Sequence, residues 1–111
     1  QIEQVSRDLK RMAKELNVPV IVMSSLSRKN EMREDKRPIL SDLRETGQIE
    51  FDADVVMFIH REEYYNPDTE KRGIAEIIVA KHRKGPIGIA ELGWIGELTK
   101  FVDIERLERR Y

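Results

Sequence analysis

The chain contains no cysteine. Disulfide bonds and thiolate metal sites are therefore excluded, and a reducing, cytoplasmic compartment is expected. No apolar run approaches the roughly 20 residues that a membrane-spanning helix needs. The first residues, QIEQVSRDLKRM, also lack the hydrophobic region of a signal peptide. We therefore expect a protein without a membrane partner.

A strong charge of one sign is also lacking, because the formal net charge is only -1. No overall field attracts the chain to nucleic acid, so any anion site must come from a local cluster of cations. Hydrophobic residues make up 40% and charged residues 37% of the 111 positions. These values indicate one small folded domain, or part of one, with a heavily charged surface.

Several motifs of catalysis are missing. The chain has no GxxxxGK[ST] phosphate loop and no nucleophile elbow. Its two histidines, His60 and His82, lie far apart in the sequence. No carboxylate or histidine stands at a ligand-like spacing from either, so no metal site is predicted.

The first third of the chain predicts a helix followed by a buried strand. Apolar residues recur at helical spacing over residues 2–16, and Asn17 and Pro19 predict the end of that helix. The run PVIVM at residues 19–23 is apolar and rich in β-branched residues. Such a run is typical of a strand in the middle of a parallel sheet covered by helices. The fold class predicted is therefore α/β.

Polar and apolar segments alternate in the remainder. We predict an aperiodic mobile loop over residues 24–38 and a short helix over residues 41–47, with Ser41 as its N-cap and Gly47 closing it. A second buried strand is predicted at residues 55–59 and a second polar loop at 60–72. Further strands are predicted at residues 74–83, 88–95 and 99–104.

Two clusters of polar residues can be interpreted either as parts of a functional site or as ordinary surface residues. Ser24 and Ser25 follow the first predicted strand, where α/β proteins bind ligands, but strands often end in polar residues. The segment RETG at residues 44–47 combines an arginine with backbone amides, which suits a phosphate. In isolation a solvated helix end explains it as well.

A third cluster, AKHRKGPIG at residues 80–88, lies in a predicted β-hairpin. Because the predicted strand runs to Arg83, Lys81 and Arg83 share one face, about 7 Å apart, and His82 points to the other. That span could contact two phosphates, and the Gly85-Pro86 turn limits backbone freedom. A hairpin tip that needs only solubility is an equally good explanation on physical grounds.

The ordered set of motifs closely resembles the carboxy-terminal half of the RecA-like motor domain in replicative DNA helicases of the DnaB family. The resemblance rests on NVPVIVMSSLSR, DKRPILSDLRETGQIEFDADVVMFIHR, YYN and GIAEIIVAKHRKGPIG, and covers residues 1–101. It implies that residues 1–111 are part of a RecA-like sheet flanked by helices and ending in an antiparallel hairpin.

The resemblance also implies roles for particular residues. Arg44, Glu45 and Gly47 match the loop that holds single-stranded DNA in the channel of a hexameric ring. Lys81 and Arg83 match the hairpin that reaches the nucleotide of the neighbouring subunit, with Arg83 as the arginine finger. Ser25 matches the γ-phosphate sensor, where the family usually has glutamine.

The implied activity is ATP-dependent translocation on single-stranded DNA and unwinding at the replication fork, with ATP and Mg²⁺ as cofactors. The implied partners are single-stranded DNA, five further copies in a homo-hexamer, a primase and a helicase loader. In the family the phosphate loop and catalytic glutamate lie upstream, and the chain does not begin with methionine. We therefore expect a fragment that cannot hydrolyse ATP alone. The alternatives are a non-catalytic RecA-like module for nucleic-acid binding or oligomerisation, and a RecA-fold ATPase of recombination or repair.

Overall fold

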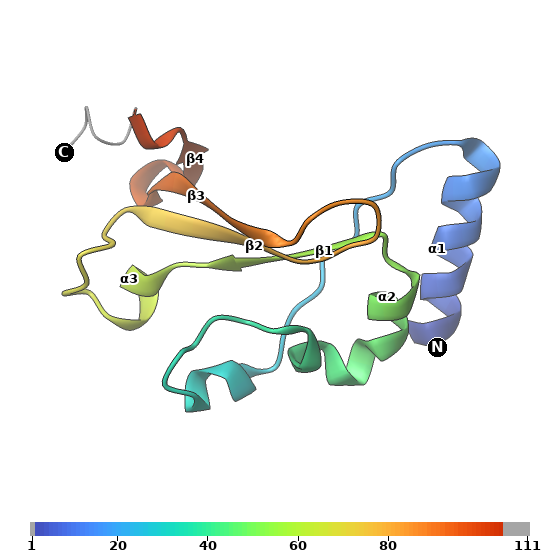
Figure 1. Ribbon diagram of the computed structural model, residues 1–111, viewed down its shortest axis with the longest axis horizontal. Coiled ribbons are helices and arrows are strands. Elements are labelled where there is room, and N and C mark those ends of the chain that lie inside the picture. Colours follow the sequence, from blue (N-terminus) through green and yellow to red (C-terminus); the bar gives the residue numbers. More distant parts are fainter. Residues whose placement is uncertain (1, 106–111) are drawn as a thin grey trace. The chain divides into compact units, whose positions relative to one another are not determined.

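The computed structural model describes the backbone of residues 2–105 and the side chains of residues 4–43 and 47–105 (Figure 1). Contacts divide the chain into two compact units, the first ending at Val56 and the second beginning at Met57. The first unit is mainly helical, and the second contains the sheet except for its first two residues, Val55 and Val56. No described helix is long and apolar enough to cross a membrane.

The first unit begins with helix α1 (Ile2–Leu16), as predicted. The helix ends where Asn17 adopts a left-handed conformation with φ of 53°. Asparagine tolerates this conformation because its short side chain can bond locally. The backbone N–H of Val18 then donates to the carbonyl of Ala13 at 3.1 Å. The predicted helix and its end are both confirmed.

The predicted buried strand at residues 19–23 is wrong. The structure assigns no strand there, and Ile21 and Met23 are 90% and 93% exposed. A β-branched apolar run becomes a strand only if a neighbouring strand offers it hydrogen bonds. The four described strands form one sheet that does not include this run.

The polar stretch that follows is more ordered than the predicted loop. It contains the 3-10 helix η1 (Arg28–Met32), in which Asn30 is buried. The Asn30 side-chain amide donates to the carbonyl of Lys36 at 2.8 Å. That hydrogen bond closes the segment back on itself, and sequence periodicity has no signal for such a contact.

The short helix predicted at residues 41–47 differs at both ends. It is a 3-10 helix, η2 (Leu40–Thr46), whose N-cap is Ile39 rather than Ser41. Gly47 does not close it, because Gly47 has right-handed helical angles (φ -55°, ψ -30°) and the chain continues into α2 (Gly47–Asp52). Glycine ends a helix by adopting a positive φ, and here it does not.

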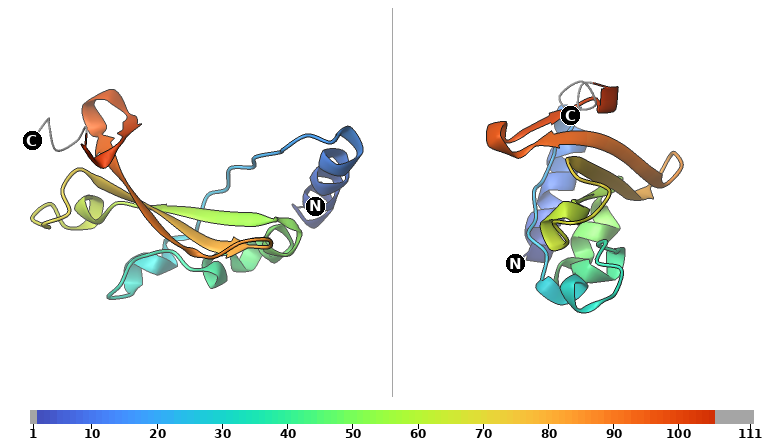
Figure 2. Two further views of the ribbon diagram at one scale, coloured as in Figure 1. Left: turned by 45° about the horizontal axis from the view of Figure 1, so that its top comes forward. Right: turned by 90° about the vertical axis from the view of Figure 1, so that its left-hand side faces the viewer.

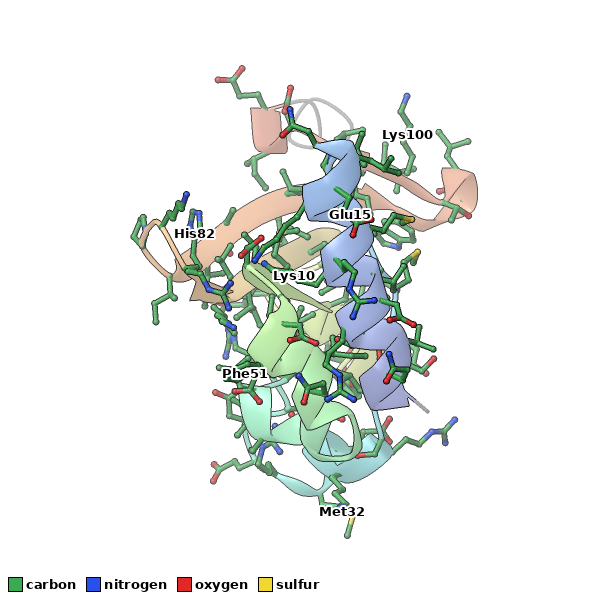
Figure 3. The ribbon with its side chains drawn as sticks, turned by 90° about the vertical axis from the view of Figure 1, so that its right-hand side faces the viewer. Lys10, Glu15, Met32, Phe51, His82 and Lys100 are labelled. Carbon is green, nitrogen blue, oxygen red and sulfur yellow. The ribbon has the colours of Figure 1, made fainter. Side chains whose placement is uncertain are left out.

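Helix α2 is fastened to α1 by polar contacts. The hydroxyl of Ser6 donates to the carboxylate of Asp52 at 2.8 Å, and Lys10, labelled in Figure 3, lies 2.7 Å from the carboxylate of Asp54. Burial raises the pKa of Asp52, but hydrogen bonds from Gln48 and Ser6 outweigh it, so the pKa lies below its usual value. These contacts explain why the chain stays helical past Gly47.

The sheet of the second unit has four strands in the order β1-β2-β3-β4. They are β1 (Val55–His60), β2 (Ile74–His82), β3 (Gly88–Ile95) and β4 (Lys100–Val102). Helix α3 (Glu62–Tyr65) lies within the predicted polar loop after β1, and the 3-10 helix η3 (Gly96–Leu98) precedes β4. Figure 2 shows the long hairpin of β2 and β3 from two further sides. The predicted hairpin and last strand are confirmed.

The expectation of a strand buried on both faces at residues 55–59 is wrong for β1. Val56, Phe58 and His60 are buried, whereas the residues between them are exposed. The antiparallel pairing of β2 with β3, expected for the predicted hairpin, is confirmed, and β3 also pairs antiparallel with β4. One covered face is what antiparallel sheets commonly have.

The core of the sheet lies around Ile95 and Val102, with Ile74 packed against them. The register of β2 and β3 runs from Ile74 opposite Gly93 to Val79 opposite Gly88. The paired part of the hairpin is thus anchored in the core, and residues 80–87 extend beyond the register. This extension carries the cation cluster.

Candidate functional site

The turn of the hairpin begins one residue earlier than predicted. Strand β2 ends at His82, and the backbone N–H of Gly85 donates to the carbonyl of His82 at 3.3 Å. Arg83 and Lys84 are therefore the two central residues of a β-turn. The alternation that predicted a shared face for Lys81 and Arg83 applies to Lys81 only, because Arg83 lies in the turn.

The hairpin tip carries a cluster of cations next to the exposed side chain of Ile87. Arg83 and Lys84 are exposed and Lys81 is partly buried. No acidic residue occurs in the sequence between Glu76 and Glu91. A guanidinium offers a planar fork of donors to a phosphate, and an ammonium offers a compact charge beside it. This part of the hairpin can bind a phosphorylated ligand.

Sequence reasoning treated His82 as a bystander, but its ring contacts the turn. The Nδ1 atom of His82 lies 3.1 Å from the carbonyl oxygen of Pro86 (Figure 3). The imidazole also covers Gly85, since a Cβ added there would overlap three ring atoms. A histidine three residues before a Gly-Pro turn was the available signal, and its meaning depends on the geometry of the turn.

Ser25, predicted to sense the γ-phosphate, belongs to the first unit. It is exposed and lies in the segment without regular structure after α1. The hydroxyl of Ser24 donates to the carbonyl of Ser25 at 3.3 Å. The residues predicted for the nucleotide site are thus divided between the two units, with Lys81 and Arg83 in the second.

The residues predicted to contact DNA are also in the first unit. Arg44 and Glu45 belong to η2 by their backbone, and their side chains lie outside the described residues. Gly47 is exposed, and a Cβ added to it would meet nothing within 4 Å. Packing within the described residues therefore does not demand glycine at position 47.

An ion pair that sequence reasoning missed holds the start of this helical segment. Both terminal nitrogens of Arg33 donate to the carboxylate of Asp42, each at 2.9 Å, and the backbone N–H of Ile39 donates to Asp42 at 2.8 Å. One Arg33 nitrogen also donates to the carbonyl of Arg37 at 2.9 Å. The hydrogen bond from Arg33 is the main reason that the pKa of Asp42 lies below its usual value. We call Arg33, Asp42 and their backbone partners the loop clamp.

A metal ion has no evident place in the described part of the chain. No group of three histidine, aspartate or glutamate side chains there could hold one. The two histidines have other contacts: His60 is 2% exposed with its Nε2 3.0 Å from Glu62, and His82 contacts Pro86.

Comparison with known families decides the affiliation of the chain. A model described as DnaB-like helicase C terminal domain matches residues 1–103. The chain belongs to this family. Among solved structures, a DnaB-like replicative helicase described together with its interactions with primase matches with a TM-score of 0.91 and 55% identity. That match covers 94% of this chain and 25% of the solved one.

Curated proteins of the family are similar along nearly the whole chain. Replicative DNA helicase DnaB of Geobacillus stearothermophilus is 54% identical over 106 residues, which are 96% of this chain and 23% of the relative. Replicative DNA helicase DnaC of Bacillus subtilis is 52% identical over the same shares. A solved ATPase domain matches with a TM-score of 0.90 and 54% identity, over 93% of this chain and 36% of that one. The chain thus spans about a quarter of the curated relatives, and its neighbours have the RecA-like helicase fold.

Proposed function

We propose that this DnaB-family chain is the carboxy-terminal half of the motor domain of an ATP-dependent replicative DNA helicase. The observation that carries the proposal is the match along nearly the whole chain to replicative helicases at 54% identity. The motor is a homo-hexameric ring that translocates on single-stranded DNA in the cytoplasm and unwinds the duplex. A primase and a helicase loader are its proposed partners, and a solved relative described with primase supports the first.

The hairpin tip contributes to hydrolysis in the neighbouring subunit. Phosphoryl transfer spreads negative charge over the oxygens of the γ-phosphate, and a positioned guanidinium stabilises that charge. Arg83 is suited to this role because it is exposed at a turn between two paired strands. Lys81 binds the same phosphates. ATP and its Mg²⁺ are held mainly by residues outside this chain.

The segment from η2 to the start of α2 contacts single-stranded DNA in the channel. Arg44, Glu45 and Gly47 hold the phosphate backbone, and Ser25 senses the γ-phosphate from the segment upstream. Two features support this: Gly47 is exposed, and the loop clamp fixes the start of η2. A loop that is fixed at its base presents its backbone amides in one arrangement.

The finger is tested by Arg83→Ala in the full-length protein that contains this chain. We expect ATP turnover to fall about 10³-fold or more, with nucleotide affinity largely retained, because a finger acts in the transition state. Lys84→Ala removes the neighbouring cation of the same turn, and a much smaller loss of turnover than in Arg83→Ala assigns the effect to the guanidinium at position 83. Normal turnover in Arg83→Ala would refute the assignment.

The DNA contact is tested by the salt dependence of binding. Binding of the full-length protein to single-stranded DNA should weaken steeply as salt rises, because cations on the protein displace counterions from phosphates. Arg44→Ala should flatten that slope by about 0.7 for each phosphate that Arg44 neutralises. An unchanged slope would remove Arg44 from the DNA interface.

A further inference from the structure

The hairpin turn is held by a side chain as well as by its backbone. The only backbone hydrogen bond described across it, from Gly85 to His82, is long at 3.3 Å. The second contact joins Nδ1 of His82 to the carbonyl of Pro86 at 3.1 Å. It links the first residue of the four-residue turn to the residue that directly follows the turn. In the sequence, Arg83 lies between the two residues that each of these hydrogen bonds joins.

We infer that His82 is a positioning residue, whose imidazole holds the turn in the conformation that presents Arg83 to a phosphate. The inference rests on the proposed function, in which Arg83 acts on the nucleotide of a neighbouring subunit. A guanidinium at the end of a flexible turn would sample many orientations, and few of them would meet the charge that develops in the transition state. Holding the backbone on both sides of Arg83 removes that freedom in advance.

The chemistry of the contact assigns the proton on His82. A carbonyl oxygen can only accept a hydrogen bond, so Nδ1 must carry the hydrogen. Both the neutral Nδ1–H tautomer and the imidazolium meet this requirement. In either form Nδ1 is the donor and the carbonyl of Pro86 the acceptor.

Gly85 contributes to the same contact, because it leaves room for the His82 ring. Its φ is not in the left-handed region, so backbone freedom does not explain glycine here. Space does explain it: a Cβ at position 85 would overlap Cε1, Nδ1 and Nε2 of the His82 ring. Any larger residue at position 85 must therefore displace the ring from its place over the turn.

The test is a set of variants in the full-length protein, assayed for DNA-stimulated ATP turnover. His82→Ala should lower kcat about 10-fold or more, with KM nearly unchanged, because binding of the nucleotide does not need the positioned finger. His82→Asn places an amide donor near the position of Nδ1 and should restore most of kcat. His82→Phe keeps a ring over Gly85 but has no donor, and should behave like His82→Ala.

Two double variants test whether His82 acts through the turn and through Arg83. In the Gly85→Ala background, where the ring is already displaced, His82→Ala should have little further effect. In the Arg83→Ala background, His82→Ala should likewise change nothing. Hexamer formation, measured by size-exclusion chromatography, should be intact in every variant.

The possible failures are distinguishable. If Arg83→Ala abolishes turnover but His82→Ala leaves kcat unchanged, the inference is wrong and the proposed function stands. If the losses of kcat caused by His82→Ala and Gly85→Ala multiply in the double variant, His82 does not act through the turn, and the inference is wrong. Normal turnover in Arg83→Ala would instead overturn the proposed function itself.

Discussion

Replacing Asp42 with alanine should loosen the segment that we propose to contact DNA. The Asp42 side chain is 4% exposed and accepts three hydrogen bonds, two from Arg33 and one from the backbone of Ile39. A hydrogen bond to a charged group contributes about 1.5–3 kcal/mol. The donors left behind lie closer to solvent and recover part of the loss from water. The net cost for Asp42→Ala is therefore about 2–3 kcal/mol of local stability.

Hydrogen exchange in the full-length protein, followed by mass spectrometry, measures this cost directly. A loss of 2–3 kcal/mol corresponds to exchange about 30- to 150-fold faster in residues 28–46. Glu34→Ala is the matched control, because it removes an exposed carboxylate from the same segment. Unchanged protection in Asp42→Ala, or an equal change in Glu34→Ala, would refute the role of the loop clamp.

The same contact predicts a dependence on pH. The pKa of Asp42 is lowered in the folded protein, chiefly by the hydrogen bond from Arg33. A lowered pKa stabilises the fold above the unfolded value, near 3.8, and that stabilisation is lost as pH falls through the folded value. Exchange in residues 28–46, corrected for intrinsic rates, should therefore accelerate only below about pH 3.8. Asp42→Asn should abolish this acceleration.

Elements with local signals could be predicted from the sequence. Helix α1 follows from the apolar spacing of residues 2–16 and its end from Asn17, because both depend only on the chain close by. The hairpin of β2 and β3 follows from alternation on both sides of a Gly-Pro turn. Strand β2 is one residue shorter than alternation predicts, which moves Arg83 from the strand into the turn.

Elements that depend on distant partners could not be predicted. The apolar run at residues 19–23 has the composition of a strand, but strand pairing requires a neighbour that composition does not identify. The start of η2 depends on Arg33 and Asp42, which are nine positions apart and match no local capping pattern. The prediction for Gly47 is wrong for the same reason, because contacts between α1 and α2 keep the chain helical past it.

The candidate site also has parts that could be predicted from the sequence and parts that could not. The position of Lys81 and Arg83 near a hairpin turn could be predicted, because clustered cations and a turn are visible in the sequence itself. The contact of His82 with Pro86 could not, because a ring reaches a carbonyl four residues away only in one conformation of the turn. Alternation predicts that His82 points away from Lys81. In the structure the His82 ring contacts the turn at Gly85 and Pro86.

Two further changes test the sheet by hydrogen exchange in the full-length protein. Phe58→Ala should destabilise β1 by about 3–4 kcal/mol, since its side chain is buried, whereas the 74% exposed Phe51 should tolerate the same change. Lys71 bridges Glu76 and Glu91, register partners on β2 and β3, at 3.2 Å from each. Lys71→Met removes this cation from the buried Glu76 carboxylate, which lies opposite the like charge of Glu91, at a cost of about 1–2 kcal/mol because the lysine is itself half-exposed. Adding Glu76→Gln to Lys71→Met should recover most of that loss. If Lys71→Met alone leaves hydrogen exchange unchanged, solvent already screens the charge of Glu76.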